Sequence, residues 1–494
     1  MSTQGKEVIR SELEPNAVGL AGALMQGVTS IAPSFSILAS FVSTVILAGL
    51  VSPWAFLIAG IILILQAVNA SQLAKEIPSA GGWYTWIARS LSPRAGFAAG
   101  SVISLWMPGV AVFDTAYLSY AVLQPSIKQY YGVNIPWWVY VVVGVALVIW
   151  AAYRGIKLSV KTIIITGSLE MLIMVVLAIS GLASPGKGGF NFDSFKFTEF
   201  HQAPDLFLAI TFGILGFLGW EAVAPLAEET KRPRRNVPLG MIGAIIVLLV
   251  FYVITSWGYL VGFGTSDLTA VTGSTGWAVI TLAQHLWGPA WFLVLFSLLN
   301  SVLATGLASF NAASRTWFSM GRSGVLPAAL GRISEKRKTP NNANLVQVGV
   351  CVLCLIIDVI FGPDDVFFTW AIFLTLSVLI MYIMSNVGVV LYFTRVRRDQ
   401  FNVILHLVFP VVATVVVFYV GYKSVVPLPP NPEKWAPVVT VAWFAAVAIF
   451  LIVRRVRYGK NEAWLTKAQQ AMEEAATGED SSLLAAGNSG AGAE

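Results

Sequence analysis

The sequence predicts an all-α polytopic membrane protein with twelve transmembrane helices. Hydrophobic residues make up 56% of the 494 residues and charged residues only 11%, and the mean hydropathy is +0.75. Apolar stretches long enough to cross a bilayer, for which about 20 residues are needed, recur along most of the chain. Because backbone polar groups must be satisfied inside the hydrocarbon, each stretch is expected to be a helix.

The spans follow one another with short connections. They are predicted at residues 17–43, 53–74, 96–122, 136–153, 160–183, 205–228, 239–263, 289–318, 344–361, 366–393, 403–421 and 435–456. The remaining residues form an N-terminal tail, 1–15, and a C-terminal tail, 458–494, whose polar composition is typical of disorder.

Lys and Arg fall almost entirely in alternate connections. Of 31 such residues, the five in the opposite set are Lys128, Lys187, Lys196, Lys423 and Lys434. Since cytoplasmic loops carry the excess of Lys and Arg, both termini are predicted to be cytoplasmic, in a multi-pass protein of the plasma (inner) membrane. The net charge of +6 thus reports orientation and some affinity for anionic membrane lipid, and no nucleic-acid partner is expected.

Two predicted spans carry helix-disrupting residues at mid-depth. The first has Gly27 and Pro33, and the sixth has three glycines followed by Pro225. They occupy corresponding places in two five-span halves of opposite orientation, 16–184 and 205–395, which precede two further spans in 396–457. Paired interruptions of this kind are the best sequence indication of a transporter binding site. The alternative is that Gly and Pro here serve only close helix packing.

Unwound centres suit a zwitterion. A carboxylate finds N–H groups and the positive end of a helix dipole, and an ammonium finds free carbonyl groups. Pro33 suits the first turn of the second half-helix, where its missing N–H costs nothing.

Four stretches together resemble the amino acid–polyamine–organocation (APC) transporter superfamily. They are PSAGGWYTWIARSLSPRAGF from Pro78, YRGIK from Tyr153, FLGWEAVAPLAEETKRPRRNVPLGM from Phe217 and SRTWFSMGRSGVLPAALGRISEKRKTPNNA from Ser314. The resemblance covers residues 17–395. It implies the LeuT-type fold, with two inverted five-helix repeats and two additional helices, and secondary transport by alternating access.

The resemblance also implies where substrate binds. The expected substrate-binding residues are Ser30, Ile31, Ala32, Pro33, Ser34, Phe217, Gly219, Trp220 and Glu221. The chain departs from the family at 31–33, where a small Gly-Ser-Gly run is usual. Ile31 narrows the pocket and Pro33 offers no amide, so the N–H groups of Ala32 and Ser34, or the hydroxyls of Ser30 and Ser34, would have to hold a carboxylate.

Three acidic residues within spans are ion-coupling candidates, because ionising a carboxyl group in hydrocarbon costs several kcal/mol unless it is paired or wet. Glu221 matches an acidic family position that responds to protons in exchangers of basic amino acids. Glu170 stands about where some proton-driven members carry a Lys in place of the sodium of sodium-driven relatives. Because a Glu has the opposite charge, it cannot replace sodium in that way. Thr305 and Ser309 are possible oxygen partners for a cation bound beside Glu170. Asp114 is a weaker candidate. For all three, a purely structural hydrogen bond is the alternative.

Several other side chains are placed by the same reasoning. Cys351 and Cys354 are expected to be small core residues. Asp358 is expected to be exposed to water near the end of a span. Trp83 and Trp86 are expected at the membrane interface. Glu228 and Glu229 are expected to face the basic cluster at 231–235.

The sequence therefore predicts a secondary-active amino acid permease, working by proton-coupled symport or exchange. A polyamine or cationic amine transporter and a sodium-coupled symporter are the alternatives within this class; a sensor and a channel lie outside it. No metal-binding, nucleotide-binding or nucleophile motif is present, so neither enzymatic activity nor a cofactor or metal is expected.

Overall fold

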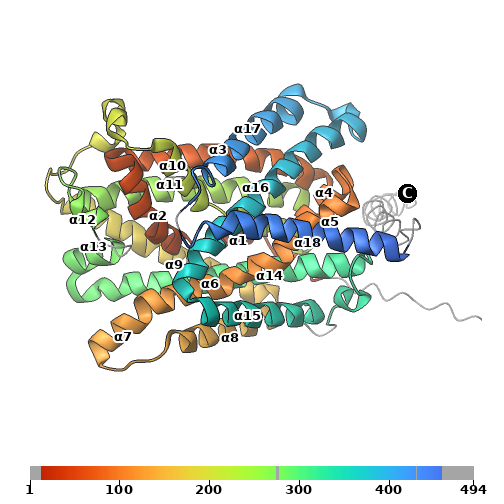
Figure 1. Ribbon diagram of the computed structural model, residues 1–494, viewed down its shortest axis with the longest axis horizontal. Helices are drawn as coiled ribbons and strands as arrows, with labels where there is room; N and C mark the ends of the chain where they lie inside the picture. Colours follow the sequence, from red (N-terminus) through yellow and green to blue (C-terminus); the bar gives the residue numbers. More distant parts are fainter. Residues whose placement is uncertain (1–12, 274–277, 335–336, 430, 459–494) are drawn as a thin grey trace, which may run out of the picture.

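The computed structural model describes residues 13–273, 278–334, 337–429 and 431–458. These residues form a bundle of helices (Figure 1), and the only β-type pairing among them is an isolated bridge between Val18 and Thr230. The predicted all-α class is therefore confirmed. The C-terminal tail expected to be disordered lies outside the described residues.

The first half of the chain contains the helices that carry the first five predicted spans. They are α1 (Leu20–Thr29), α2 (Pro33–Ala48), α3 (Ser52–Glu76), α4 (Trp83–Ser90), α5 (Pro93–Ser101), α6 (Val110–Leu118), α7 (Gln124–Tyr131), α8 (Trp137–Tyr153) and α9 (Ile156–Ala183). Between α5 and α7, two π-helical turns and one 3₁₀ turn join the pieces into one long rod over Pro93–Gln129.

The second half contains α10 (Leu206–Leu215), the 3₁₀ helix η7 (Trp220–Glu229), α11 (Pro233–Phe263), α12 (Thr269–Thr272), α13 (Ala278–Trp287), α14 (Phe292–Arg322), α15 (Asn341–Phe361) and α16 (Pro363–Arg395). Two more helices follow, α17 (Phe409–Lys423) and α18 (Trp435–Tyr458).

Ten helical segments within the described residues are long and apolar enough to cross a membrane. One of them, Leu20–Glu76, contains the first two predicted spans, and the 17-residue α8 over the fourth predicted span is shorter than the others. A polytopic helical protein is thus confirmed, whereas twelve crossings remain a prediction.

The two predicted helix interruptions are confirmed. α1 ends at Thr29 and α2 begins at Pro33, and between them Ala32 adopts a left-handed conformation with φ +55°. α10 ends at Leu215, a glycine-rich turn follows, and the chain resumes as the 3₁₀ helix η7. Proline at the first helical position of α2 needs no N–H partner, which explains why the helix restarts there.

Small residues allow the central helices to pack closely. α11 lies against α1, α3 and α9. A side chain at Gly258 of α11 would lie 2.6 Å from the carbonyl oxygen of Ala178 in α9, and one at Gly27 of α1 would lie 2.8 Å from Ala244. Close contacts of this kind hold helices together where the surrounding medium is as apolar as the side chains.

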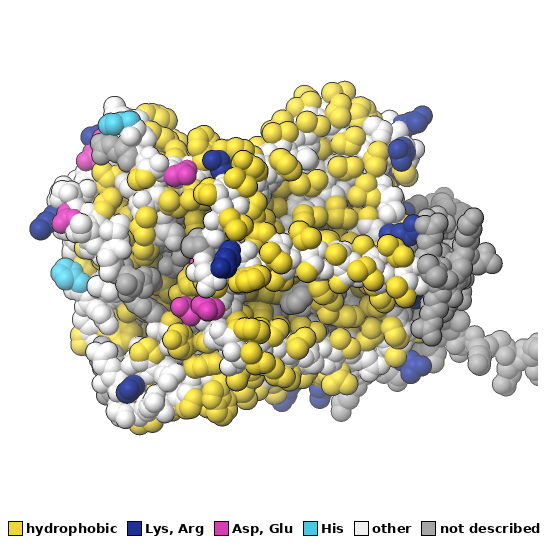
Figure 2. All heavy atoms as spheres, viewed as in Figure 1, with side chains coloured by type: hydrophobic (Ala, Val, Ile, Leu, Met, Phe, Trp, Pro, Cys, Tyr) yellow, Lys and Arg dark blue, Asp and Glu magenta, His cyan; other side chains and the backbone are white. Residues whose placement is uncertain are grey.

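Apolar side chains cover the outer helices. Exposed examples are Leu172 of α9, Val359 of α15, Phe418 of α17 and Val441 of α18. Figure 2 shows hydrophobic side chains over much of one face, with Lys and Arg at both ends of the view and at a few places between them. This surface is suited to lipid contact.

The structure corrects the expected positions of Trp83, Trp86 and Asp358. Trp83 and Trp86 are buried rather than interfacial, because α4 inserts between α5 and α16. Asp358 is also buried, and neither of its oxygens has a hydrogen-bond partner among the described residues. Cys351 and Cys354 are buried free thiols, as expected.

Glu228 and Glu229 do not face the basic cluster at 231–235, contrary to the prediction, because α14 supplies their partners. Arg315 donates from Nε to Glu229 Oε2 at 2.6 Å and from Nη2 to Glu229 Oε1 at 3.1 Å, and both side chains are almost fully buried. Arg322 pairs with Glu228 in a more exposed position. The bidentate pair ties η7 to α14.

Glu229→Ala should therefore leave the Arg315 guanidinium buried without its counter-ion. We expect a loss of about 3–5 kcal/mol in the free energy of unfolding, measured by thermal unfolding of the detergent-solubilised protein. Asp193→Ala, which removes the exposed ion pair with Lys196, is the matched control and should leave the unfolding temperature nearly unchanged. Equal effects of the two substitutions would contradict a structural role for the buried pair.

Candidate functional site

The two helix interruptions touch each other. Gly219, which precedes η7, has φ +133°, a conformation that L side chains rarely adopt. A Cβ atom there would overlap the Ser30 carbonyl oxygen and lie 3.0 Å from Ile31 N. Glycine is thus required at 219 for both its conformation and its contact.

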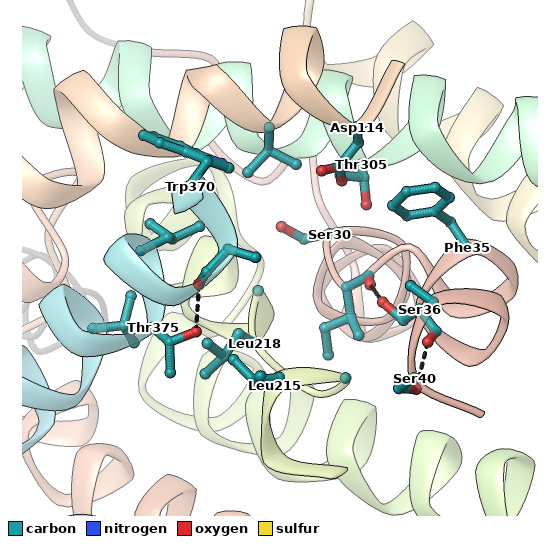
Figure 3. A pocket seen from close by; sticks show the side chains of 18 of the residues that line it. Ser30, Phe35, Ser36, Ser40, Asp114, Leu215, Leu218, Thr305, Trp370 and Thr375 are labelled. Atoms are coloured by element: carbon teal, nitrogen blue, oxygen red, sulfur yellow. Dashed lines mark hydrogen bonds between the residues drawn. The ribbon is translucent and has the colours of Figure 1, made fainter. Parts of the chain in front are cut away.

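A cavity of about 180 Å³ lies beside this contact. In Figure 3, Trp370 and Thr375 of α16 lie on one side and Phe35, Ser36 and Ser40 of α2 on the other, with Ser30, Asp114 and Thr305 between them. Phe35 meets Phe367 edge to face at 5.7 Å between ring centroids, and Tyr117 stacks on Phe367 at 4.2 Å. These rings lie between this cavity and a second one of about 200 Å³, which is lined by α2, the α6 region and α16.

The structure divides the predicted site residues into two groups. Those that line the cavity are Ser30, Ile31, Gly219, Glu221, Asp114, Thr305 and Ser309. Those that lie behind its wall are Ala32, Pro33, Ser34, Phe217, Trp220 and Glu170. Phe217, for example, packs edge to face against Tyr252 of α11 at 4.9 Å.

Glu221 is held by both chain and side-chain donors. The Gly219 N–H donates to its Oε2 at 2.7 Å, and the Tyr382 hydroxyl donates to Oε1. Trp83 Nε1 donates to the Glu221 carbonyl oxygen at 3.3 Å. The rings of Trp83, Trp220 and Tyr382 lie within 5.5–5.7 Å of one another, so an aromatic cluster surrounds this buried carboxyl group.

Glu170 of α9 lies at the start of α2. Its Oε2 accepts from Asn300 Nδ2 at 2.5 Å, its Oε1 accepts from Ser301 Oγ at 3.1 Å, and the Ser34 N–H also interacts with this carboxyl group. The first turn of a helix is where the dipole favours negative charge. Glu170 therefore joins α9, α14 and the second half of the first interrupted span.

Thr305 does not bond Glu170. Its hydroxyl donates to the Thr29 carbonyl oxygen at the end of α1, whereas the α14 partners of Glu170 lie one turn or more earlier. Ser309 lines the cavity one turn beyond Thr305.

Asp114 borders the cavity from α6. No hydrogen bond or ion pair joins its carboxyl group to any other residue that the structure describes. Among the described residues, no Lys, Arg or His side chain lines the cavity.

Sequence reasoning missed the contributions of α16 and part of α14. Tyr382, Trp370 and Phe367 stand in an uninterrupted apolar helix, where nothing local distinguishes them from packing residues. Asn300 could have been noticed, because an amide side chain inside an apolar span needs a polar partner.

Comparison with known proteins agrees with this architecture. The family model described as "Amino acid permease" matches residues 22–469. The chain belongs to the amino acid permease family. Members of this family, and the relatives described next, are transporters rather than enzymes, as the sequence predicted.

Similarity to individual relatives is distant. The chain is 22% identical to cationic amino acid transporter 1 of Arabidopsis thaliana, over 76% of this chain and 64% of the relative. It is 26% identical to the low-affinity putrescine importer PlaP of Escherichia coli (strain K12), over 62% and 66%. It is 24% identical to the large neutral amino acids transporter small subunit 2 of Mus musculus, over 61% and 57%. The chain thus spans 57–66% of the length of these curated relatives, less than two thirds of each.

Gly219→Ala should force the two interruptions apart. We expect a loss of about 1–3 kcal/mol in the free energy of unfolding from backbone strain alone, together with loss of ligand binding at the cavity. Gly349→Ala is the control, since Gly349 lies within α15 with no atom within 4 Å of the added Cβ, and it should be neutral or slightly stabilising. Thermal unfolding with and without ligand measures the change in stability and the loss of binding. Wild-type behaviour of Gly219→Ala would show that the contact between the two interruptions is not needed for the site.

Proposed function

We propose that this protein is a secondary-active permease for a small amino acid or amine, which carries its substrate by alternating access and couples transport to protons. The observation that carries the proposal is the contact of two interrupted helices beside a cavity lined by two carboxyl groups, Asp114 and Glu221. Binding sites of secondary transporters lie at such interruptions. A channel would instead need a continuous polar path, and this cavity has largely apolar walls.

The proposed architecture follows the sequence prediction. Residues 16–184 and 205–395 would form the inverted repeats, residues 396–457 the two additional helices, and both tails would lie in the cytoplasm of a plasma-membrane protein. Substrate would lie between the unwound centres, in contact with Ser30, Ile31, Gly219 and Glu221. The residues behind the wall, such as Ser34 and Trp220, would hold these first contacts in place.

Two closures on opposite sides of the cavity support alternating access. On the predicted cytoplasmic side, the Arg315–Glu229 pair joins η7 to α14, and Val18 donates to the Glu229 carbonyl oxygen at 2.9 Å. On the other side, Phe35, Tyr117 and Phe367 pack together. We infer that opening one closure while the other holds exposes the cavity to one side at a time.

Glu221 is the proposed proton carrier. Its carboxyl group accepts from the Gly219 N–H and the Tyr382 hydroxyl, so it links the interruption to α16. A proton on the carboxyl group would weaken both bonds, because charge-assisted hydrogen bonds are roughly twice as strong as neutral ones. The protonation state of Glu221 would then determine how firmly η7 is held against α16.

The names of the relatives support only the broad substrate class, a small amino acid or amine. Their names cover cationic amino acids, large neutral amino acids and putrescine. What they share is a small ammonium compound, which a cavity with two acidic side chains can accommodate.

Purified protein in liposomes should accumulate a radiolabelled amino acid or amine under an inward proton gradient. Glu221→Gln should abolish the response to the gradient, because the amide oxygen can accept from the Gly219 N–H and the amide NH2 can donate to the Tyr382 hydroxyl oxygen, but the amide cannot exchange a proton. Asp365→Asn, which neutralises an exposed carboxyl group outside the cavity, should behave as wild type.

Two outcomes would contradict the coupling. If Glu221→Gln accumulates substrate with the same dependence on the proton gradient, Glu221 does not carry the proton. If accumulation follows an inward sodium gradient at equal pH, the coupling ion is sodium.

A further inference from the structure

The hydrogen-bonding groups around the cavity point to a narrower substrate class. We propose that the cavity selects organic amines that lack a carboxylate, because the protein's own carboxyl groups occupy the positions that would bind the carboxylate of an amino acid. This inference rests on the proposed transport function and specifies its substrate.

At the first interruption, the backbone N–H groups between α1 and α2 already have acceptors. Ser30 N donates to Gln26 O, Ile31 N to Val28 O, and Ala32 N to Thr29 O, at 3.1–3.2 Å. Residue 33 is proline and has no N–H. The next two amides are those of Ser34, which interacts with Glu170, and Phe35, which donates to Ser301 Oγ at 3.4 Å.

Hydroxyl groups offer little more to a carboxylate. Ser34 Oγ is hydrogen-bonded to Ser297 Oγ at 2.8 Å and lies behind the wall. Of the four groups that the sequence offered for carboxylate capture, only the Ser30 hydroxyl lines the cavity without a partner among the described residues.

The second interruption has the same arrangement. The N–H groups of Gly216, Phe217 and Leu218 donate to carbonyl oxygens of α10, and the Gly219 N–H donates to the Glu221 carboxyl group. An internal carboxyl group thus lies at the start of the second half of each interrupted span: Glu170 reaches α2 through Ser301, which accepts from the Phe35 N–H, and Glu221 accepts directly from the Gly219 N–H before η7. A second anion at either place would have to displace a buried group of like charge, which is unfavourable.

Most hydroxyls that face the cavity present acceptors rather than donors. Ser36 donates its proton to Ile31 O at 2.6 Å, Ser40 to Ser36 O at 2.5 Å and Thr375 to Ala371 O at 2.7 Å (Figure 3). Thr305 likewise donates to Thr29 O. A hydroxyl whose proton is engaged offers only its lone pairs to a ligand, and lone pairs suit an ammonium.

Asp114 supplies the matching charge. It is an acid on the cavity wall with no hydrogen-bond partner among the described residues, and the cavity-lining residues of the described chain include no cation that would compensate it. An ammonium beside Asp114 would gain a counter-ion, and its remaining N–H donors would find hydroxyl lone pairs on the cavity wall. Phe35, Phe367 and Trp370 provide aromatic walls for the carbon chain and for cation–π contact.

The test compares amines with the amino acids from which they differ only by the carboxylate. Uptake into proteoliposomes and thermal stabilisation of the full-length protein are measured for four pairs: putrescine and ornithine, cadaverine and lysine, agmatine and arginine, and tyramine and tyrosine. For at least one pair, the amine should bind at least about tenfold more tightly than the amino acid, because a buried charge left without a partner costs affinity of this order or more. An amino acid that binds as well as its amine in every pair would overturn the inference while leaving the proposed transport function intact. If no member of any pair binds or is taken up, both are overturned.

Two variants identify the groups responsible. Asp114→Asn should weaken binding of the preferred amine at least about tenfold and leave folding intact, since the side chain has no partner to lose; Asp365→Asn is the control and should not change affinity. Glu170→Gln should lower the ratio of amine to amino acid affinity, since it removes one internal negative charge. Unchanged affinity in Asp114→Asn would overturn the assigned ammonium site, and an unchanged ratio in Glu170→Gln would overturn the assigned role of Glu170.

Discussion

The structure depends on how backbone groups are satisfied where two helices are interrupted deep in an apolar bundle. An unpaired peptide group costs several kcal/mol in such a place, so an interruption persists only if other groups bond it. Here the interruptions bond partly within themselves, partly through side chains of α9, α14 and α16. Gly219 makes the arrangement possible, because it alone permits the turn before η7 to lie against Ser30.

Two buried carboxyl groups complete this bonding. Glu170 interacts with the amide that opens α2 and with two side chains of α14, and Glu221 bonds the amide that precedes η7 and the hydroxyl of Tyr382. The same two residues are structural caps and proposed functional groups, and these roles do not conflict. A carboxyl group that holds a half-helix in place is well placed to release it when its charge changes.

The hydrogen-bonding properties of the cavity depend on the groups that these bonds leave free. Amides are engaged and several hydroxyl protons are directed to carbonyl oxygens, so the groups that remain toward the cavity are mainly acceptors and the carboxyl group of Asp114. Family membership by itself would lead one to expect an amino acid with its carboxylate bound at the first interruption. The particular residues of this chain, Pro33 and Glu170 above all, change that expectation.

Much of the fold was accessible from the sequence by itself. Hydrophobic length determines where helices cross, and Gly and Pro determine where Pro33 and Gly219 interrupt them, because these effects are local to a few residues. Acidic residues inside apolar spans, such as Glu221 and Asp114, were equally visible. A charged side chain in hydrocarbon costs free energy, so its presence there indicates a structural or functional role. What only the tertiary structure decided is which groups meet: that Glu170 meets Asn300 and Ser301 rather than Thr305, that Arg315 pairs with Glu229, and that Tyr382 reaches Glu221. These partners lie 86 to 161 residues apart in the chain. Their pairing depends on how whole helices pack side by side, which local patterns do not encode.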